Sequence, residues 1–290
     1  MNHTQINIGR KIKALALDLD GTVLLPDASL GEHTIAVLKK LIAKDIQIIL
    51  CTGRAVEAAE AYCRAIGAQG PMVFFNGAEV VDMPSLAMLH ADLLDLDVAN
   101  FGIDVARSMG VHYQIYLPPG TYGTGKWEPL LVDKLTPESE KYRNRTGIEP
   151  IVTDLITAMN TPGLPGCIKA MFIAAPETHD EIKERLLNRF GDKIYIARTS
   201  PTYLEIMNNG VSKGAGLKKA LKCRGIDAAS VLALGDEESD ILMFEAAGFS
   251  AAPANGRETT LEAADFIFGS NADEGIADFL EGFFLDTKRR

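Results

Sequence analysis

The sequence predicts an α/β protein in which a parallel sheet, covered by helices on both faces, carries an inserted α+β domain. Short apolar segments alternate with helical patterns at both ends of the chain, which is typical of a parallel sheet. From about residue 83 to residue 197 the pattern changes to a mixed α+β one. The 290 residues, 47% of them apolar, are enough for two domains with cores of their own.

The first part of the core domain is expected over residues 1–82. Its first strand ends at Asp18, because the run before it alternates and then becomes wholly apolar, as a buried parallel strand does. Gly21 then breaks the strand. The other elements expected in this part are the helix 32–44, the strand 46–51, the helix 56–66 and the strand 72–75.

The inserted domain is expected over residues 83–197 and the second part of the core domain over residues 198–290. A Pro/Gly-rich stretch, residues 118–125, predicts an exposed loop in the insert. The insert's regular elements are the helix 98–109, the strands 111–117 and 168–174, the helix 177–190 and the strand 193–197. The returning core contributes the helix 214–223, the strand 230–234, the helix 238–247, the strand 264–268 and the helix 275–284.

Composition argues against several partners. The net charge is −10 and no long basic run occurs, which argues against nucleic acid as a partner. No apolar run reaches about 18 residues, so no membrane-spanning segment is expected. The N-terminus has no apolar signal region, and the four cysteines match no zinc pattern, so we expect reduced thiols in a cytoplasmic protein. The sequence does not predict the oligomeric state.

Two carboxylates, Asp18 and Asp20, follow the first strand. Burying both beside a strand end costs several kcal/mol unless a cation or protons compensate. A hard divalent ion with oxygen ligands, Mg²⁺ above all, is the simplest compensation. Taken alone, the same segment also fits a helix-capping Asp followed by a turn Asp.

Three further polar clusters lie where strands or loops meet helices: Thr52-Gly53, Lys213-Gly214, and Gly235-Asp236 with Asp240. The carboxyl ends of parallel strands meet at one edge of a sheet, which is where open α/β sheets bind ligands. Singly, each cluster fits an ordinary turn, a solvated lysine or a helix cap. Their order and placement together favour a common site.

This site fits phosphoryl transfer. A carboxylate can attack phosphorus to form an aspartyl-phosphate, and the rigidly held Asp18 is the candidate nucleophile. Asp20 is the candidate acid that gives a proton to the leaving oxygen and later takes one from water.

The remaining groups match the charge of a phosphoryl group. Its oxygens need a cation and fixed donors, which the Thr52 hydroxyl, the Gly53 N–H and the Lys213 ammonium offer. Asp236 can complete a Mg²⁺ site with Asp18 and a backbone carbonyl, expected to be that of Asp20.

These residues resemble the motifs of the haloacid dehalogenase superfamily of phosphohydrolases, and most closely its Cof-type, subfamily IIB sugar-phosphate phosphatases. The resemblance covers nearly the whole chain. Its four motifs appear in order as Asp18-Leu19-Asp20-Gly21-Thr22-Val23-Leu24, Thr52 of Thr52-Gly53-Arg54, Lys213 of Val211-Ser212-Lys213-Gly214, and Gly235-Asp236-Glu237-Glu238-Ser239-Asp240.

The resemblance implies a Rossmann-like doubly wound core with a C2-type cap inserted between the second and third motifs. It also implies Mg²⁺-dependent hydrolysis through Asp18 and Asp20, with phosphoryl binding by Thr52 and Lys213 and metal binding at the fourth motif. There Asp236 and Asp240 match the family, whereas Ser239 replaces the Asn that the family commonly has. Ser239 is therefore a candidate phosphate-binding residue, with a shorter side chain that could act through a water.

The predicted function is Mg²⁺-dependent hydrolysis of a small phosphorylated metabolite, expected to be a sugar phosphate. A phosphotransferase or phosphomutase would use the same motifs with a sugar hydroxyl in place of water. A weakly active family member or a regulatory module without turnover is also open, because of Ser239. A signalling receiver domain fits less well, since it lacks the second acid and the insert. Cationic side chains of the cap are expected on the solvated surface: Lys126, Arg143, Arg145 and Lys169.

Overall fold

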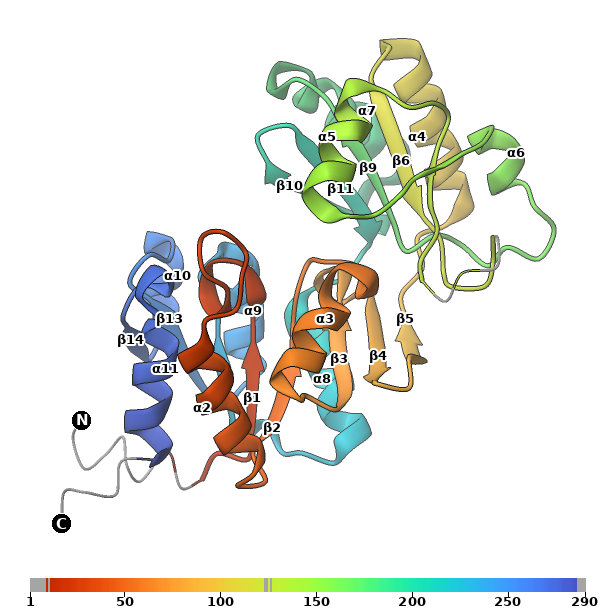
Figure 1. Cartoon of the computed structure of the whole chain (residues 1–290). Coiled ribbons are helices and arrows are strands. Elements are labelled where there is room, and N and C mark those ends of the chain that lie inside the picture. The colour runs from red at the N-terminus through yellow and green to blue at the C-terminus, as the bar shows by residue number, and fades with distance from the viewer. Residues whose placement is uncertain (1–8, 10, 123–124, 126, 286–290) are drawn as a thin grey trace. The chain divides into compact units, whose positions relative to one another are not determined.

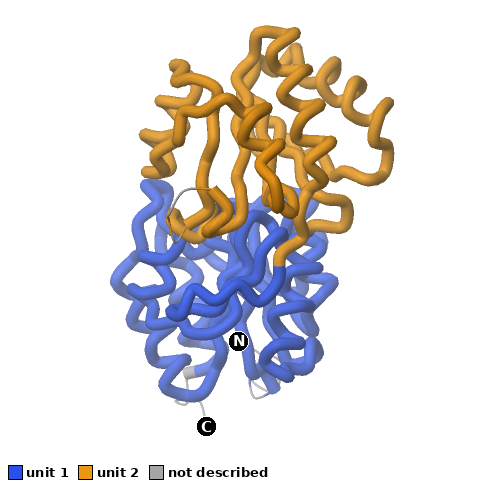
Figure 2. The backbone as a smooth tube through the Cα atoms, turned by 90° about the vertical axis from the view of Figure 1, so that its right-hand side faces the viewer, with its two compact units in different colours: residues 1–54, 59–90, 212–290 blue, residues 55–58, 91–211 orange. Residues whose placement is uncertain are grey.

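The computed structural model describes residues 9, 11–122, 125 and 127–285 (Figure 1). The chain divides into two compact units, coloured separately in Figure 2. One, the core unit, comprises residues 1–54, 59–90 and 212–290, and the other, the cap unit, comprises residues 55–58 and 91–211. No helix among the described residues is both long and apolar enough to cross a membrane.

The core unit is built on a five-stranded sheet with the order β14-β13-β12-β1-β2. Every neighbouring pair is parallel, as the sequence predicts. β1 lies between β12 and β2, so its carboxyl end has a parallel strand on each side. The strands are β1 (Ala14–Leu17), β2 (Gln47–Leu50), β12 (Val231–Leu234), β13 (Phe249–Pro253) and β14 (Phe266–Phe268).

A smaller sheet continues from β2. A parallel bridge between Cys51 and Val73 links β2 to β3 (Gly70–Phe74), which pairs antiparallel with β4 (Glu79–Met83). β5 (Ala87–Ala91) is the third strand of this sheet. Neither β4, β5 nor β13 is predicted by the sequence analysis. The segment Phe249-Ser-Ala-Ala-Pro253 contains a single residue with high strand propensity, so only pairing with its neighbours identifies it.

Helices cover both faces of the core sheet (Figure 1). On one face, α8 and α9 pack on Ala14, Ala16 and Ile49 through apolar side chains that include Leu217 and Met243. α2 and α11 pack together on the other face. The helices are α2 (Glu32–Ile42), α3 (Val56–Ile66), α8 (Lys213–Arg224), α9 (Glu238–Glu245), α10 (Glu258–Ala263) and α11 (Gly275–Leu280).

The cap unit has a six-stranded sheet with the order β10-β11-β9-β6-β7-β8. Its pairs are antiparallel apart from β7 and β8. The strands are β6 (His112–Tyr116), β7 (Leu130–Val132), β8 (Ile151–Val152), β9 (Lys169–Ile173), β10 (Ile194–Ser200) and β11 (Tyr203–Asn208). The helices are α4 (Leu96–Met109), α5 (Pro137–Thr146), α6 (Leu155–Met159) and α7 (His179–Phe190).

The two faces of the cap sheet differ in chemistry because side chains alternate along each strand. Apolar side chains on one face pack against α4 and α7; they include Ile115, Phe172 and Ile206. The alternate positions on the other face include Gln114 and Glu205, which lie in one row with Met171 between them. The buried side chains of Gln114 and Glu205 therefore lie on the face opposite α4 and α7.

Strand pairing determines where the cap unit begins and ends in the sequence. The sequence analysis places the return to the core at residue 198, but β11 pairs antiparallel with β9 and so extends the cap sheet to Asn208. At the other limit, β4 and β5 extend the core unit to residue 90. β9 and β11 are separated in the chain by α7 and β10, so local patterns do not report their pairing.

The expectation that Lys169 is solvated is wrong. Its side chain is 3% exposed and pairs with the buried Glu205, whose Oε1 accepts a hydrogen bond from Lys169 Nζ at 3.0 Å. Arg143 forms an exposed pair with Glu149, and Arg145 lies over the Tyr203 ring. Lys126 lies outside the described residues.

Candidate active site

The predicted site residues of the core strands meet at one edge of the core sheet. The strand register aligns Leu17 with both Leu50 and Leu234, so the residues that follow these positions lie side by side. The Asp18 N–H donates to Leu234 O at 2.9 Å, which fixes the backbone of the candidate nucleophile. Asp236 follows β12 by two residues.

The turn after Asp18 brings the chain against Asp236. Gly21 adopts a φ of +79°, a conformation that favours glycine, and a Cβ there would lie 2.2 Å from Asp236 Oδ2. The next residue, Thr22, is buried and donates through Oγ1 to Asp236 Oδ1 at 2.7 Å. Asn255 Nδ2 donates to Gly21 O at 2.9 Å. Gly21 therefore permits the close approach of the first and fourth motifs.

Lys213 joins two carboxylates. Its Nζ lies 2.7 Å from Asp18 Oδ1 and 2.7 Å from Asp240 Oδ1, and its side chain is 4% exposed. Ser212, the N-cap of α8, accepts from the Ala215 N–H and so fixes the first turn that carries Lys213. Burial alone would lower the pKa of Lys213, but the two carboxylates raise it above its ordinary value, so the side chain is an ammonium.

Both oxygens of Asp240 are already used within the core unit. Oδ1 accepts from Lys213, and Oδ2 accepts from the N–H groups of Asp236 and Glu237 at 3.0 Å each. Asp240 thereby fixes the turn that presents Asp236. The sequence analysis expects Asp240 at the metal, and its oxygen does lie within the acidic cluster, but these contacts favour a positioning role.

The cluster carries more negative than positive charge. One oxygen from each of Asp18, Asp236 and Asp240 lies within 4.8 Å of the others, and Lys213 is the ammonium among them. Burial raises the pKa of Asp18 well above its ordinary value despite Lys213, and burial raises that of Asp236 to about 6. Three carboxylates and one ammonium leave an excess of two negative charges, which a divalent cation with oxygen ligands fits.

Thr52 and Gly53 follow β2 at the same edge. Thr52 is fully buried, and its Oγ1 accepts from the Arg54 N–H at 3.1 Å. Its backbone is fixed on two sides, since its N–H donates to Val73 O and its carbonyl accepts from the Asn76 N–H. A Cβ on Gly53 would lie 2.9 Å from Asn76 Oδ1, so glycine accommodates a neighbouring side chain here.

Arg54 is a site residue that the sequence analysis missed. The Asp20 carboxylate is 58% exposed and accepts two hydrogen bonds from Arg54, from Nε at 2.8 Å and from Nη2 at 2.5 Å. Arg54 Nη1 donates to Tyr62 Oη at 3.1 Å, and Tyr62 Oη donates to Ala28 O. The only signal in the sequence is that Arg54 directly follows Thr52-Gly53.

Ser239 lies apart from this network. It is exposed at the second residue of α9, between the exposed Glu238 and the buried Asp240. No described residue forms a hydrogen bond with its hydroxyl. The structure thus brings together Asp18, Thr52, Lys213, Asp236 and Asp240 as buried residues, next to the more exposed Asp20 and Gly53. Ser239 stays outside this group.

Comparison with known proteins agrees with this geometry. A 5-amino-6-(5-phospho-D-ribitylamino)uracil phosphatase of Bacillus subtilis is 26% identical over 93% of this chain and 97% of its own length. A pyridoxal phosphate phosphatase of Escherichia coli is 26% identical, over 92% of this chain and 97% of its own length. The solved structure of TM0651 from Thermotoga maritima superposes with a TM-score of 0.81 at 27% identity, covering 93% of this chain and 97% of that one.

A family model agrees with these similarities. The model described as haloacid dehalogenase-like hydrolase matches residues 15–280, which include every residue of the acidic cluster and the whole cap unit. The match spans far more than half of the chain, and the fold it implies, a Rossmann-like core with an inserted cap, is the fold found here. The chain therefore belongs to the haloacid dehalogenase-like hydrolase family.

Proposed function

We propose that this protein is a Mg²⁺-dependent phosphatase that hydrolyses a small phosphomonoester, with a sugar phosphate as the expected class, through an aspartyl-phosphate. The observation that carries the proposal is the buried contact of Asp18 with Lys213 in a cluster with excess negative charge. The names of the similar bacterial proteins, which are phosphatases of small phosphorylated molecules, support it.

In the first half-reaction the free oxygen of Asp18 attacks phosphorus, and the bond from phosphorus to the leaving alcohol oxygen breaks. Asp20 gives a proton to that oxygen. Lys213, already 2.7 Å from Asp18 Oδ1, provides positive charge beside the nucleophile, where the phosphoryl oxygens develop charge. Thr52 and the Gly53 N–H offer further donors to these oxygens.

In the second half-reaction Asp20 takes a proton from water, which attacks phosphorus and releases inorganic phosphate and the Asp18 carboxylate. Asp18, Asp236 and the carbonyl of Asp20 would hold Mg²⁺. When bound, the ion neutralises the excess charge of the carboxylates and polarises the phosphoryl oxygens. Asp240 holds Lys213 and the Asp236 turn in place.

The ion pair of Arg54 with Asp20 must open before Asp20 can act as an acid. Both Asp20 oxygens accept hydrogen bonds from Arg54, so the guanidinium occupies both of them. Asp20 can carry a proton to the leaving group once Arg54 releases one of these oxygens. A dianionic phosphoryl group is a suitable competing partner for the guanidinium.

The test is phosphate release from sugar phosphates, nucleotides and p-nitrophenyl phosphate, with Mg²⁺ or with EDTA, for the wild type and Asp18→Asn. We expect Mg²⁺-dependent release that Asp18→Asn lowers at least about 1,000-fold while the circular dichroism spectrum stays unchanged. Asp278→Asn, at a residue 79% exposed and outside the cluster, is the matched control.

The outcomes separate the alternatives. Full activity in EDTA, or in a folded Asp18→Asn variant, would contradict the proposed mechanism. Transfer of the phosphoryl group to an added sugar in place of water would identify a phosphotransferase with the same nucleophile.

A further inference from the structure

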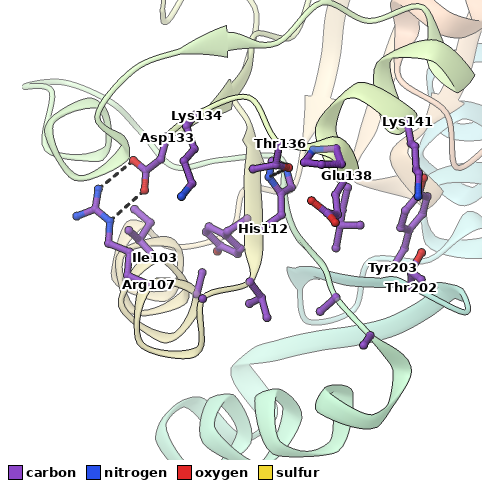
Figure 3. Close-up of a pocket in the computed structure, with 18 of the residues that line it drawn as sticks. Ile103, Arg107, His112, Asp133, Lys134, Thr136, Glu138, Lys141, Thr202 and Tyr203 are labelled. Atoms are coloured by element: carbon purple, nitrogen blue, oxygen red, sulfur yellow. Dashed lines mark hydrogen bonds and ion pairs between the residues drawn. The ribbon is translucent and has the colours of Figure 1, made fainter.

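The cap cavity shown in Figure 3 and the candidate active site differ in how their polar side chains are bonded. The cavity has a volume of about 740 Å³, and in its lining Arg107 donates to Asp133 and Thr136 contacts His112. Its charged side chains have both signs, so the lining does not favour a ligand of one charge. At the candidate active site, by contrast, the side-chain amide of Asn76 forms no hydrogen bond with any described residue. Such an amide can donate to a ligand.

Asn76 is held beside Gly53 by backbone hydrogen bonds. It lies in the turn after β3, where its N–H donates to Thr52 O at 3.0 Å and the Phe75 N–H donates to Arg54 O at 3.1 Å. These bonds join the turn to the residues on both sides of Gly53. The position of Asn76 relative to the candidate phosphoryl-binding segment is therefore fixed.

The amide of Asn76 lies against the backbone of Gly53. A Cβ on Gly53 would lie 2.9 Å from Asn76 Oδ1, 3.2 Å from Nδ2 and 3.3 Å from Cγ. The amide group of Asn76 therefore takes the space that a side chain at position 53 would need. Asn76 is half-buried, so its side chain is not sealed within the core of the unit.

The same turn packs on the segment that carries Lys213. A Cβ on Gly77 would lie 2.0 Å from Ser212 O, and Ser212 is the N-cap of α8, whose first residue is Lys213. The turn that holds Asn76 is therefore in contact with both segments whose donors are expected to bind the phosphoryl group.

The backbone of this turn is one that few side chains adopt. Phe75, Asn76 and Gly77 all have a positive φ, of 47°, 55° and 104°. For a bulky residue such as the buried Phe75 this conformation is unfavourable. Strained backbone persists mainly where a functional side chain has to be fixed. Asn tolerates a positive φ better than most residues, so the role of its amide has to be separated from that of its backbone.

We propose that Asn76 binds the substrate of the phosphatase reaction, its side-chain N–H donating to a phosphoryl oxygen beside the Gly53 N–H. This inference rests on the proposed function, since it adds a donor to the same phosphoryl group. The amide is uncharged, so it binds the phosphoryl oxygens without adding to the negative charge of the acidic cluster. A donor fixed in this way stabilises the charge that these oxygens carry in the transition state.

Two substitutions separate the amide from the backbone. Asn76→Asp keeps the shape and tolerates the positive φ but replaces the donor by a carboxylate, and Asn76→Gly removes the side chain at a φ that suits glycine. With p-nitrophenyl phosphate and Mg²⁺, we expect Asn76→Asp to lower kcat/KM at least about 100-fold and Asn76→Gly at least about tenfold. Asp45→Gly, at an exposed residue with a φ of 63° outside the site, is the matched control and should leave kcat/KM unchanged.

Binding of inorganic phosphate tests the same contact without turnover. Calorimetry of the Mg²⁺-loaded full chain should give a Kd for phosphate at least about tenfold higher in Asn76→Asp than in the wild type, with an unchanged circular dichroism spectrum. Weaker phosphate binding in Asn76→Asp would support the contact even if the wild type released no phosphate from any tested ester, a result that would contradict only the proposed hydrolysis.

Two results would overturn the inference and leave the proposed function standing. One is wild-type kcat/KM and wild-type phosphate affinity in a folded Asn76→Asp variant. The other is full activity of Asn76→Gly, because a carboxylate at position 76 would then inhibit by repulsion alone and the amide would have no part in binding.

Discussion

Two buried lysines, one in each unit, have opposite surroundings. Lys213 in the core unit lies 2.7 Å from each of two carboxylates, and a third, Asp236, belongs to the same cluster. Lys169 in the cap unit donates to Glu205 at 3.0 Å, and its ammonium lies 5.5 Å from the centroid of the Tyr116 ring. Both side chains are almost fully excluded from solvent.

The difference is one of charge balance. Lys169 and Glu205 carry equal and opposite charge and form a buried ion pair. Around Lys213 there are three carboxylates and one ammonium. Burial of these carboxylates raises the pKa of Asp18 and of Asp236. Among the described residues, the Asp18 cluster is the one group whose acidic ligands are close enough to hold a metal. Burial of charge indicates a functional site where the charges do not cancel.

The largest expected effect is on catalysis. Lys213→Met removes the ammonium beside the nucleophile, and we expect turnover of p-nitrophenyl phosphate to fall at least about 100-fold. Lys169→Met should change the same rate less than about threefold, because Lys169 is paired within the cap unit. Initial rates at saturating Mg²⁺ measure both.

Each variant needs a check of folding, by circular dichroism and by urea unfolding, before its rate is interpreted. If Lys213→Met and Lys169→Met are both folded and lose turnover to a similar extent, then Lys213 has no catalytic role that Lys169 lacks.

The next effect concerns stability. Lys169→Met leaves Glu205 buried without its ammonium, and we expect a loss of about 3–5 kcal/mol in the free energy of unfolding. Lys169→Met with Glu205→Leu replaces both charges by apolar groups and should recover most of that loss. Urea unfolding of the two single variants and the double variant forms the cycle. A double variant no more stable than Lys169→Met would show that Glu205 is not the group left unpaired.

A third effect is the pH dependence of the metal-free protein. The folded-state pKa of Asp236 is about 6, above its ordinary value of 3.8, so the folded protein retains a proton that the unfolded chain loses. Stability from this group is therefore present below pH 4 and lost as the pH rises to 6. In EDTA, Asp236→Asn should gain about 2–3 kcal/mol relative to the wild type between pH 4 and pH 7.

Thermal unfolding at several pH values measures this difference. Mg²⁺ added to the wild type at pH 7 should raise its melting temperature and leave that of Asp236→Asn almost unchanged. A difference between the two proteins that does not vary with pH would contradict an unfavourable charge on Asp236.

The sequence predicted the strands that carry the site because each is a short, wholly apolar run followed by polar residues. The parallel register of β1, β2 and β12 then brings Asp18, Thr52 and Asp236 to one edge. It did not predict contacts that depend on distant segments: Arg54 with Asp20, or Lys213 with Asp240. Strand β13 and the burial of Lys169 were missed for the same reason, since pairing with other strands determines both.

The smallest expected effect concerns Ser239, where the chain departs from the Asn common in its family. The residue is exposed in the first turn of α9 and outside the hydrogen-bonded network of Lys213 and Asp240. Ser239→Asn should therefore leave the fold intact and keep turnover within about threefold of the wild type or raise it, because an amide reaches further than a hydroxyl. The kcat and KM for the best phosphate ester measure the effect of Ser239→Asn on turnover. Ser270→Asn is not a suitable control, because the Ser270 side chain caps a 3₁₀ turn. Glu238→Gln, at the exposed neighbour, is the better match. A loss greater than about tenfold in Ser239→Asn alone would assign the serine a contact with the substrate that an amide cannot replace. The Asp18 cluster around Lys213 would then not account for all of the site's chemistry.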